Sequence, residues 1–287
     1  MTPDSPSPPL NIAALLRAHG LRPDKRLGQN FLHDESALRK IVGAAELQPT
    51  DTVLEIGPGL GSLTRHLARA ARRVIAVELD ARLLPALRQV LAACENVEII
   101  QGDILTLSPG ELISSPKTGS LKVVANIPYY ITSAILRHLL SASPRPERLI
   151  LTVQKEVATR ICAQPGNLSL LALSVQVFGH PEIVAHIPAG AFYPRPKVDS
   201  AVLRVRLYPQ PVIPADELDA FFRLTRAGFG QKRKTLLNAL AAGLGQPKTV
   251  LAPLLTAAGI DPQRRAQTLT LEEWRALTKI ARQQVVL

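Results

Sequence analysis

The sequence predicts an α/β domain with a doubly wound, mostly parallel sheet that has an antiparallel hairpin at one edge, followed by a small all-helical domain. Short apolar runs rich in β-branched residues alternate with helically spaced segments as far as residue 207. A glycine-rich turn at residues 57–61 follows one of these runs. Beyond residue 214 the apolar patterns have helical spacing. We therefore place the α/β domain at residues 11–207 and the helical domain at residues 214–287.

The length, the composition and the cysteine count exclude several classes of protein. With 287 residues, 46% of them hydrophobic, the chain can bury a substantial core. It has no apolar run of about 18 residues and no signal-peptide pattern, so we expect a cytoplasmic protein without a membrane span. Its two cysteines, Cys94 and Cys162, lie far apart without a CxxC pattern or nearby histidines, so we expect neither a disulfide nor a metal site.

The chain is strongly basic. Lys and Arg number 34 against 23 Asp and Glu, which gives a net charge of +11. Such an excess favours polyanionic partners, nucleic acid first among them. A basic protein without a polyanionic partner is the alternative until the charges are located.

A leader, two helices and a loop precede the glycine-rich turn. Residues 1–10 are rich in proline and poor in apolar side chains, which predicts a disordered leader. We expect one helix at residues 12–19 and a second, capped by Asp34 or Ser36, that runs to about residue 45. The irregular segment at residues 27–34 either docks on the core or closes over a ligand held at the turn, with Asn30 contributing hydrogen bonds.

The glycine-rich turn follows a predicted strand at residues 53–56 and leads into a helix. Gly57, Gly59 and Gly61 permit positive φ angles and let a ligand approach backbone that has no Cβ. Ser62 stands where the dinucleotide fingerprint GxGxxG has its third glycine, which weakens the case for an NAD site. A structural turn without a ligand is the alternative at this point.

Acidic residues follow the next two predicted strands, at residues 73–78 and 97–101. Glu78 lies 21 residues beyond Gly57, where a doubly wound sheet places a carboxylate for a ribose diol, and Asp103 follows the later strand. Glu78 alone suits NAD and S-adenosylmethionine equally, and either acid could be a helix cap or a surface group. Together with the turn they favour an adenosyl ligand that lies across three strand ends.

A fourth strand at residues 121–125 ends in Asn126-Ile127-Pro128-Tyr129. The exocyclic amino group of a base is a poor nucleophile because its lone pair is delocalised into the ring. The Asn126 oxygen and a backbone carbonyl can accept from its two N–H groups, while Pro128 fixes the backbone and Tyr129 stacks on the base. The pattern favours methylation of a base amino group by a sulfonium cofactor. A plain strand-to-helix turn is the alternative.

The remaining elements complete the α/β domain. The loop at residues 192–200 contains Pro194 and Pro196, which restrict the backbone and preorganise Phe192 to stack on a base. A stiff surface loop with Phe192 buried is the alternative. The other expected elements are helices at about 80–94, 155–162 and 168–178, a strand at 147–153, and an edge hairpin of strands at 182–187 and 201–207.

The helical domain contains a basic stretch without an acidic residue. Its five cations are Arg223, Arg226, Lys232, Arg233 and Lys234. Such a cluster can bind phosphates in a salt-dependent way. A solvated helix face is the competing interpretation.

Taken together, these motifs resemble the ribosomal RNA adenine N6-dimethyltransferases, and most closely the bacterial small-subunit (16S) branch, whose loss confers kasugamycin resistance. The resemblance implies a Rossmann-like, S-adenosylmethionine-dependent methyltransferase domain and a helical RNA-binding domain. It extends from about residue 20 to the end of the chain, in segments 27–32, 55–59, 77–80, 102–103, 126–130, 192–200, 230–236 and 259–274.

The resemblance also implies roles for single residues. Asn126 and the backbone around Pro128 would hold the target amino group, with Tyr129 and Phe192 enclosing the adenine. The implied product is N6,N6-dimethyladenine at two adjacent adenosines in the 3′-terminal hairpin of 16S rRNA, formed on the assembling 30S subunit. Apart from the resemblance, we expect the protein to be a monomer. Contacts to S-adenosylmethionine would come from Asn30, Leu32, Gly57, Glu78, Asp103 and Asn126.

Two other functions stay open from the sequence. Asn-Ile-Pro-Tyr also occurs in the 23S adenine methyltransferases that confer macrolide resistance, although these generally lack the segments at 230–236 and 259–274. The second alternative is a ribosome-assembly or RNA-binding factor that has kept only the fold. The intact Glu78, Asp103 and Asn126 argue against a loss of catalysis.

Overall fold

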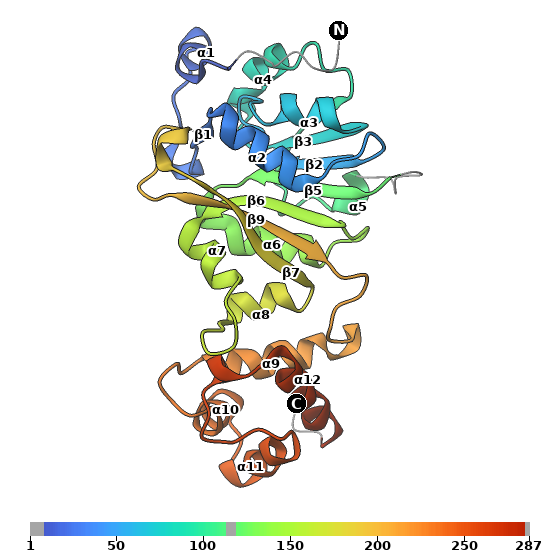
Figure 1. Cartoon of the computed structure of the whole chain (residues 1–287), viewed down its shortest axis with the longest axis vertical. Coiled ribbons are helices and arrows are strands. Elements are labelled where there is room, and N and C mark those ends of the chain that lie inside the picture. The colour runs from blue at the N-terminus through green and yellow to red at the C-terminus, as the bar shows by residue number, and fades with distance from the viewer. Residues whose placement is uncertain (1–8, 113–118, 285–287) are drawn as a thin grey trace. The chain divides into compact units, whose positions relative to one another are not determined.

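The computed structural model describes residues 9–112 and 119–284 (Figure 1). The predicted leader therefore lies almost wholly outside the described residues. The chain divides into two compact units, the first made of residues up to 158 together with 182–207, and the second of residues 159–181 together with 208–287. The domain boundaries drawn from the sequence differ from this division by the stretch 159–181.

The first unit is built on a seven-stranded sheet in the order β4-β3-β2-β5-β6-β9-β7. The strands from β4 to β6 are parallel, and β9 is antiparallel to β6. Within this sheet the first strand in the sequence is the central β2. The chain then moves outward through β3 to β4 and returns to β5 on the other side of β2, which confirms the doubly wound sheet with an antiparallel edge. The strands are β2 Thr52–Ile56, β3 Arg73–Glu78, β4 Val97–Gln101, β5 Leu121–Asn126, β6 Arg148–Gln154, β7 Gly179–Ile187 and β9 Ser200–Leu207.

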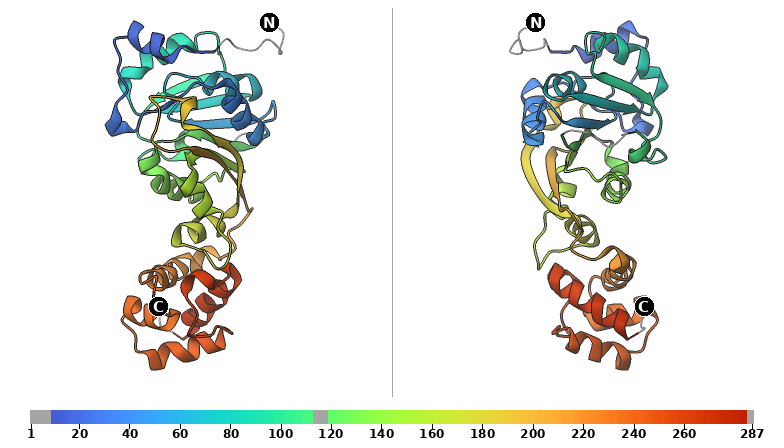
Figure 2. Two further views of the ribbon diagram at one scale, coloured as in Figure 1. Left: turned by 60° about the vertical axis from the view of Figure 1, so that its left-hand side comes forward. Right: turned by 90° about the vertical axis from the view of Figure 1, so that its right-hand side faces the viewer.

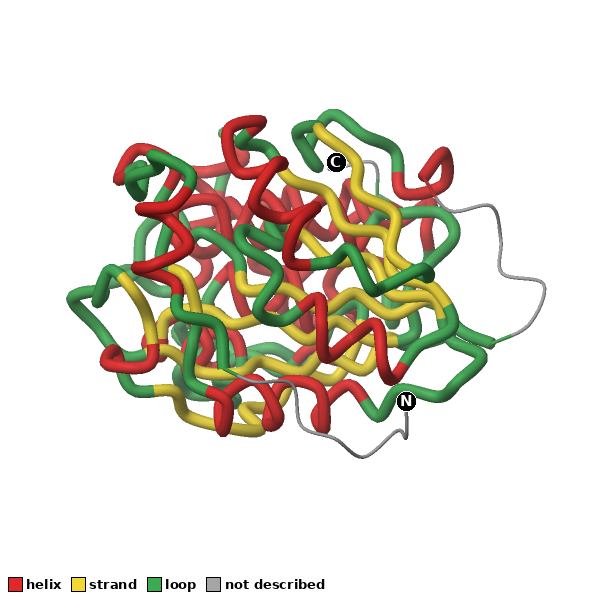
Figure 3. The backbone as a smooth tube through the Cα atoms, turned by 90° about the horizontal axis from the view of Figure 1, so that it is seen from above, coloured by secondary structure: helices red, strands yellow, loops and turns green. Residues whose placement is uncertain are grey.

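Helices cover both faces of this sheet (Figures 2 and 3). α2 Glu35–Ala45 and α3 Thr64–Ala70 pack on the face to which the fully buried Val53 belongs. Leu54 is equally buried but points to the other face, because side chains alternate along a strand. Burial on both faces explains the continuous apolar runs of β2, β3, β5 and β6, whereas the edge strand β4 is only partly buried. The other helices of this part are α1 Ile12–Ala18, α4 Leu84–Val90, α5 Pro109–Leu112, α6 Thr132–Leu140 and, at the boundary between the units, α7 Lys155–Ile161.

A short strand pair connects two segments that the sequence places in loops. β1 Phe31–Leu32 pairs antiparallel with β8 Phe192–Tyr193. The segment at 27–34 shows no periodic pattern, which predicts an irregular loop. Pairing with a distant partner, and not local propensity, gives it an extended backbone.

The helix expected at residues 80–94 is shorter in the structure. A 3₁₀ turn, η2 Ala81–Leu83, precedes α4. Pro85 lies in the first turn of α4, the part of a helix that tolerates proline. After Val90 the backbone turns toward β4, so the residues up to Cys94 are not helical.

The second unit has a helical core around Trp274, which is fully buried. Gly228 on α9 Leu218–Phe229 lets α12 Leu271–Gln283 approach closely, since a Cβ at this glycine would lie 2.6 Å from Cη2 of Trp274. The predicted helical C-terminal part is confirmed. Among the described helices, none is both long enough and apolar enough to span a bilayer. The remaining helices of this unit are α8 Leu170–Gln176, α10 Leu236–Leu244 and α11 Lys248–Ala257.

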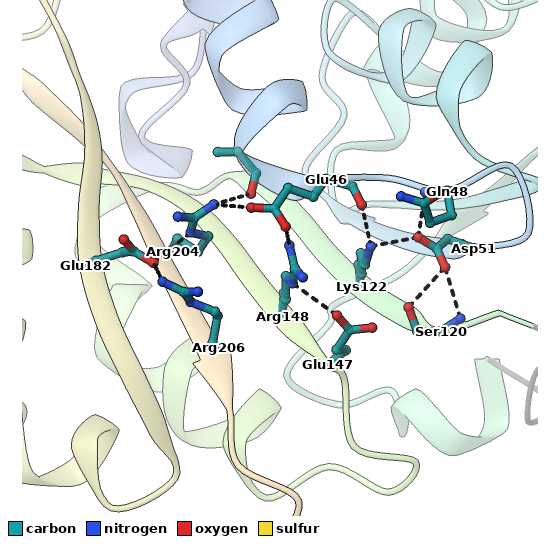
Figure 4. Close-up of polar contacts among 11 residues, drawn as sticks. Glu46, Gln48, Asp51, Ser120, Lys122, Glu147, Arg148, Glu182, Arg204 and Arg206 are labelled. Atoms are coloured by element: carbon teal, nitrogen blue, oxygen red, sulfur yellow. Dashed lines mark hydrogen bonds and ion pairs between the residues drawn. The ribbon is translucent and has the colours of Figure 1, made fainter.

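A polar network closes the amino-terminal edge of the sheet (Figure 4). Lys122 Nζ lies 2.7 Å from Asp51 Oδ2, and both side chains are 3% exposed. Lys122 also donates to the Glu46 carbonyl, while Asp51 accepts from the backbone N–H groups of Gln48 and Ser120. Burial by itself would raise the pKa of Asp51, but these donors outweigh it and lower the pKa to about 2.

Glu46 extends this network to the strands at the antiparallel edge. It ends α2 in the left-handed region, with φ +47°. Its carboxylate pairs with Arg148 of β6 and Arg204 of β9, and Arg204 in turn pairs with Glu182. The end of α2 is thereby joined to β5, β6 and β9 through charged side chains.

We expect Lys122→Met to lower the free energy of unfolding by about 3–5 kcal/mol, because the Asp51 carboxylate is left buried without its cation. Urea unfolding at pH 7 measures this loss. Since the folded pKa of Asp51 is depressed, its contribution is present above about pH 4 and is lost as the pH falls toward 2.

The control for this change is Arg206→Met. The ion pair of Arg206 with Glu182 is half exposed, so its loss should cost less than about 1 kcal/mol. If Lys122→Met cost as little as the control, the buried pair would not stabilise this edge.

Candidate active site

A cavity of about 1020 Å³, part of it open to solvent, lies at the carboxyl-terminal edge of the sheet. Its walls are the loop at residues 27–32, the glycine-rich turn, and the residues that end or follow β3, β4 and β5. Parallel strands bring their carboxyl ends to one edge, which explains why these segments meet. The lining includes eight of the residues predicted for the site: Asn30, Leu32, Gly57, Glu78, Asp103, Asn126, Pro128 and Tyr129.

The glycine-rich turn presents bare backbone to the cavity. Gly57, Gly59 and Gly61 have φ angles of +68°, +59° and +83°, all in the left-handed region. A Cβ at Gly57 would have no heavy atom within 4 Å, whereas one at Gly59 would lie 3.0 Å from the ring of Phe31. A ligand can therefore approach the backbone at Gly57, and Phe31 of the loop closes against Gly59.

Glu78 is 5% exposed at the end of β3. Its Oε2 accepts from the N–H of Gly59 and its Oε1 from the N–H of Asp80, both at 2.9 Å. Burial raises the pKa of Glu78, and the two backbone donors oppose that rise. The bonds fix the carboxylate at the cavity wall, where each oxygen keeps a lone pair for a hydroxyl donor.

Asp103 follows β4 on the same wall. Its Oδ1 accepts from the N–H of Leu105 at 2.9 Å. Within the described residues its Oδ2 has no hydrogen-bond partner. This oxygen is available to accept from a ligand that extends past Glu78.

Asn126 ends β5 with its side chain oriented by the loop. Its Nδ2 donates to the backbone carbonyl of Asn30 at 3.1 Å. Because the amide nitrogen is engaged there, Oδ1 remains as the acceptor at the cavity. Asn30 donates its own Nδ2 to the carbonyl of Gly28, so the loop holds both amides in place.

Tyr129 is anchored from the other side. Its Oη lies 2.6 Å from Oγ of Ser200, the fully buried first residue of β9. Burial raises the pKa of Tyr129, although the bond to Ser200 counters that effect. The hydroxyl is tied to the sheet and the ring lines the cavity next to Pro128.

Phe192 and the basic stretch lie outside this cavity. The Phe192 ring is 3% exposed and belongs to the core cluster that contains Leu32, its partner across the β1 and β8 pair. A direct stack of Phe192 on a base stays a prediction. All five cations of the basic stretch are exposed in the second unit, and none forms an ion pair with a described residue: Arg223, Arg226, Lys232, Arg233 and Lys234.

The structure adds residues that sequence reasoning missed. Gln29 Nε2 donates to Asp80 Oδ2 at 2.8 Å, which fastens the loop to the end of β3. Ser200 holds Tyr129 across 71 residues of sequence. Neither pairing has a sequence signal. Glu55 does have one, since it is an acid within the apolar strand β2.

Glu55 is 1% exposed, and its Oε2 has no hydrogen-bond partner among the described residues. Burial raises the pKa of Glu55 to about 8, and the nearby Glu78 adds to the rise. The folded protein therefore holds this carboxyl in its neutral form at neutral pH.

The lining fits an adenosyl cofactor. The open backbone at Gly57, the fixed carboxylate of Glu78 and the free oxygen of Asp103 supply acceptors and close contact along one edge. In the part of the chain that the structure describes, no group of three or more His, Cys, Asp or Glu side chains could hold a metal ion.

This Rossmann-like sheet, with acceptors for an adenosine beside a turn that can hold a base amino group, defines the class of base methyltransferases. Residues 20–283 match the family model described as ribosomal RNA adenine dimethylase. The chain belongs to this family. It is a methyltransferase that acts on ribosomal RNA, which confirms the predicted enzyme class.

Similar proteins include enzymes named ribosomal RNA small subunit methyltransferase A. The protein of Dehalococcoides mccartyi (strain CBDB1) is 50% identical over 275 residues, which cover 95% of this chain and 93% of the relative. That of Moorella thermoacetica is 46% identical over 284 residues, with 96% and 98% covered.

Two solved structures share the fold over most of the chain. A dimethyladenosine transferase from Plasmodium falciparum matches with a TM-score of 0.77 and 27% identity, covering 89% of this chain and 98% of that one. The 23S rRNA methyltransferase ErmE matches with a TM-score of 0.69 and 31% identity, covering 88% and 99%.

The pKa of Glu55 leads to a prediction about stability. Because this pKa is higher in the folded protein than in the unfolded chain, the contribution of Glu55 is full below about pH 4.5 and is lost as the pH rises toward 8. Between pH 5 and pH 8 the wild type should lose about 2–4 kcal/mol more unfolding free energy than Glu55→Gln. Denaturant unfolding without cofactor measures both proteins, and equal pH dependence would contradict a buried neutral Glu55.

Proposed function

We propose that this protein transfers methyl groups from S-adenosylmethionine to N6 of two adjacent adenosines in the 3′-terminal hairpin of 16S rRNA, giving N6,N6-dimethyladenine on the assembling 30S subunit. We further propose that it works as a monomer in the cytoplasm, where the subunit is assembled. The observation that supports the chemistry most directly is the orientation of the Asn126 amide, whose Nδ2 is engaged by Asn30 and whose Oδ1 is left as an acceptor.

Asn126 and the neighbouring backbone hold the target amino group in this proposal. Oδ1 of Asn126 accepts one N–H of the adenine amino group, and a backbone carbonyl near Pro128 accepts the other. Two acceptors in these directions keep the lone pair on N6 and direct it away from the ring plane. Beyond this, the protein accelerates the reaction by aligning the amino group with the methyl donor. The fixed Asn126 amide and the fixed turn at Pro128 provide this alignment.

The opposite wall holds the cofactor. Glu78 accepts from the ribose hydroxyls, Asp103 accepts from the adenine amino group, and Gly57 allows close approach of the cofactor to the backbone. Asn30 and Leu32 cover it from the loop. When bound, S-adenosylmethionine supplies a methyl group already activated by a sulfonium.

Tyr129 supplies the face on which the target adenine stacks. Its hydroxyl is fastened to Ser200, so the ring loses little freedom when a base packs on it. Phe192 encloses the adenine from the side of the β1 and β8 pair in this proposal, which requires its ring to turn out of the core.

The choice of rRNA rests on the relatives and on the second unit. The relatives named for the small subunit are 46–50% identical over at least 93% of their own lengths, whereas ErmE, named for 23S rRNA, is 31% identical. The exposed cations of the basic stretch supply a surface for phosphates.

Methylation of purified ribosomal particles tests the substrate. We expect methyl groups to appear at two adjacent adenines of undermodified 30S particles, identified by mass spectrometry after nuclease digestion. Methylation of 23S rRNA alone would contradict the proposal in favour of the resistance-type activity. Binding to 30S particles without any methyl transfer would favour an assembly factor.

We expect Asn126→Ala to lower the methylation rate by about 10²–10³-fold, because one acceptor for the amino group is removed. Binding of the 30S particle should change little, as measured by filter binding. Asn167→Ala, an exposed asparagine of the second unit, is the control and should retain full activity. An equal fall in particle binding and in rate would show that Asn126 does not act on the reaction itself.

Replacement of Lys232, Arg233 and Lys234 by Gln should weaken RNA binding and lower its salt dependence. The slope of log affinity against log salt should fall by about 0.7–0.9 for each phosphate that the variant no longer neutralises. Arg275→Gln with Lys279→Gln removes two exposed cations from α12 and serves as the control. An unchanged salt slope in the triple variant would mean that the basic stretch is only a solvated surface.

A further inference from the structure

Tyr130 is the most exposed of the large apolar and aromatic side chains among the described residues, with 60% of its surface accessible. It follows Tyr129 directly in the sequence, yet the two side chains have different surroundings. The hydroxyl of Tyr129 is bound to Ser200, whereas that of Tyr130 has no hydrogen-bond partner in the described part of the chain. Both residues line the cavity, so Tyr130 lies at its mouth.

Gly28 supports the Tyr130 ring from one side. A Cβ at Gly28 would lie 3.3 Å from Cδ1 and from Cε1 of Tyr130, and 3.3 Å from Cβ of Pro128. Gly28 has a φ of +63°, so the loop adopts a conformation that suits glycine while packing against this ring edge. The ring is thus held by the loop and the turn while most of its surface faces solvent.

The loop that packs against the ring also carries a cation, Lys25. The N–H of Gly28 donates to the carbonyl of Lys25, whose exposed side chain forms no ion pair with a described residue. An exposed aromatic ring, packed at the mouth of the cavity against a loop that also carries an exposed cation, is a combination with which proteins bind single-stranded nucleic acid. A lone exposed tyrosine elsewhere on the surface would need no such explanation.

We propose that Tyr130 stacks on the nucleobase next to the target adenine. This inference rests on the proposed function. A base that enters the cavity leaves its neighbour without a stacking partner on one side. Tyr130 replaces that partner at the cavity mouth. In a pair of adjacent target adenines, the neighbour is the second substrate, so Tyr130 holds one adenine while the other is methylated.

The test compares Tyr130 variants on two RNA hairpins that differ at one position. Both hairpins carry the target adenine, and the neighbouring position holds either 2-aminopurine or an abasic sugar. Tyr130→Ala should raise the Kd for the 2-aminopurine hairpin roughly tenfold and leave the Kd for the abasic hairpin unchanged. Tyr130→Phe, which keeps the ring, should behave as the wild type does, and Tyr130→Leu, which keeps only bulk, should behave as Tyr130→Ala does.

Fluorescence of 2-aminopurine gives a readout that does not need methyl transfer. Stacking on Tyr130 should quench the fluorescence in the wild type and in Tyr130→Phe but not in Tyr130→Ala. Equal Kd changes on the two hairpins, or quenching that survives in Tyr130→Ala, would overturn the inference. If the wild type binds and quenches but never methylates, the proposed function fails while this contact stands.

Discussion

The parallel pairing of β2 with β5 is the constraint on which the site depends. Its register sets Ile56 beside Ala125, so Gly57 and Asn126 leave the sheet next to each other although about 70 residues separate them in sequence. β3 and β4 continue the same edge and add Glu78 and Asp103. The cofactor wall and the acceptor wall are therefore joined by backbone hydrogen bonds of the sheet, which fix their separation.

Buried acidic side chains have opposite surroundings at the amino-terminal and carboxyl-terminal edges of this sheet. At the amino-terminal edge, Lys122 and backbone N–H groups satisfy Asp51 and keep its pKa low. At the carboxyl-terminal edge, Glu55 is buried without a cation and its pKa is high. At the amino-terminal edge, the buried charges find all their partners within the protein and stabilise the fold. The other edge leaves acceptors and an incompletely satisfied acid at the cavity, as is common at functional sites.

Local sequence patterns are sufficient to predict the strands of the sheet but not the conformation of the loops. The apolar runs predict β3 and β4 at their observed bounds. β3 is almost wholly buried, whereas the edge strand β4 is only partly buried. The pairing of β1 with β8 joins residues about 160 positions apart and has no periodic signal. The burial of Phe192 accompanies that pairing, and the sequence offered it only as the alternative to stacking on a base. The motifs located the cavity wall, but the orientation of Asn126 depends on the carbonyl of Asn30 and required the structure.

Titration calorimetry with S-adenosylmethionine and with NAD⁺ tests the central claim most directly, namely that the β2 and β5 edge builds a site for an adenosyl methyl donor. The account predicts saturable binding of one S-adenosylmethionine per chain and no binding of NAD⁺ at the same concentrations. Binding of NAD⁺ at least as tight as that of S-adenosylmethionine, or no saturable binding of S-adenosylmethionine at two temperatures, would contradict it.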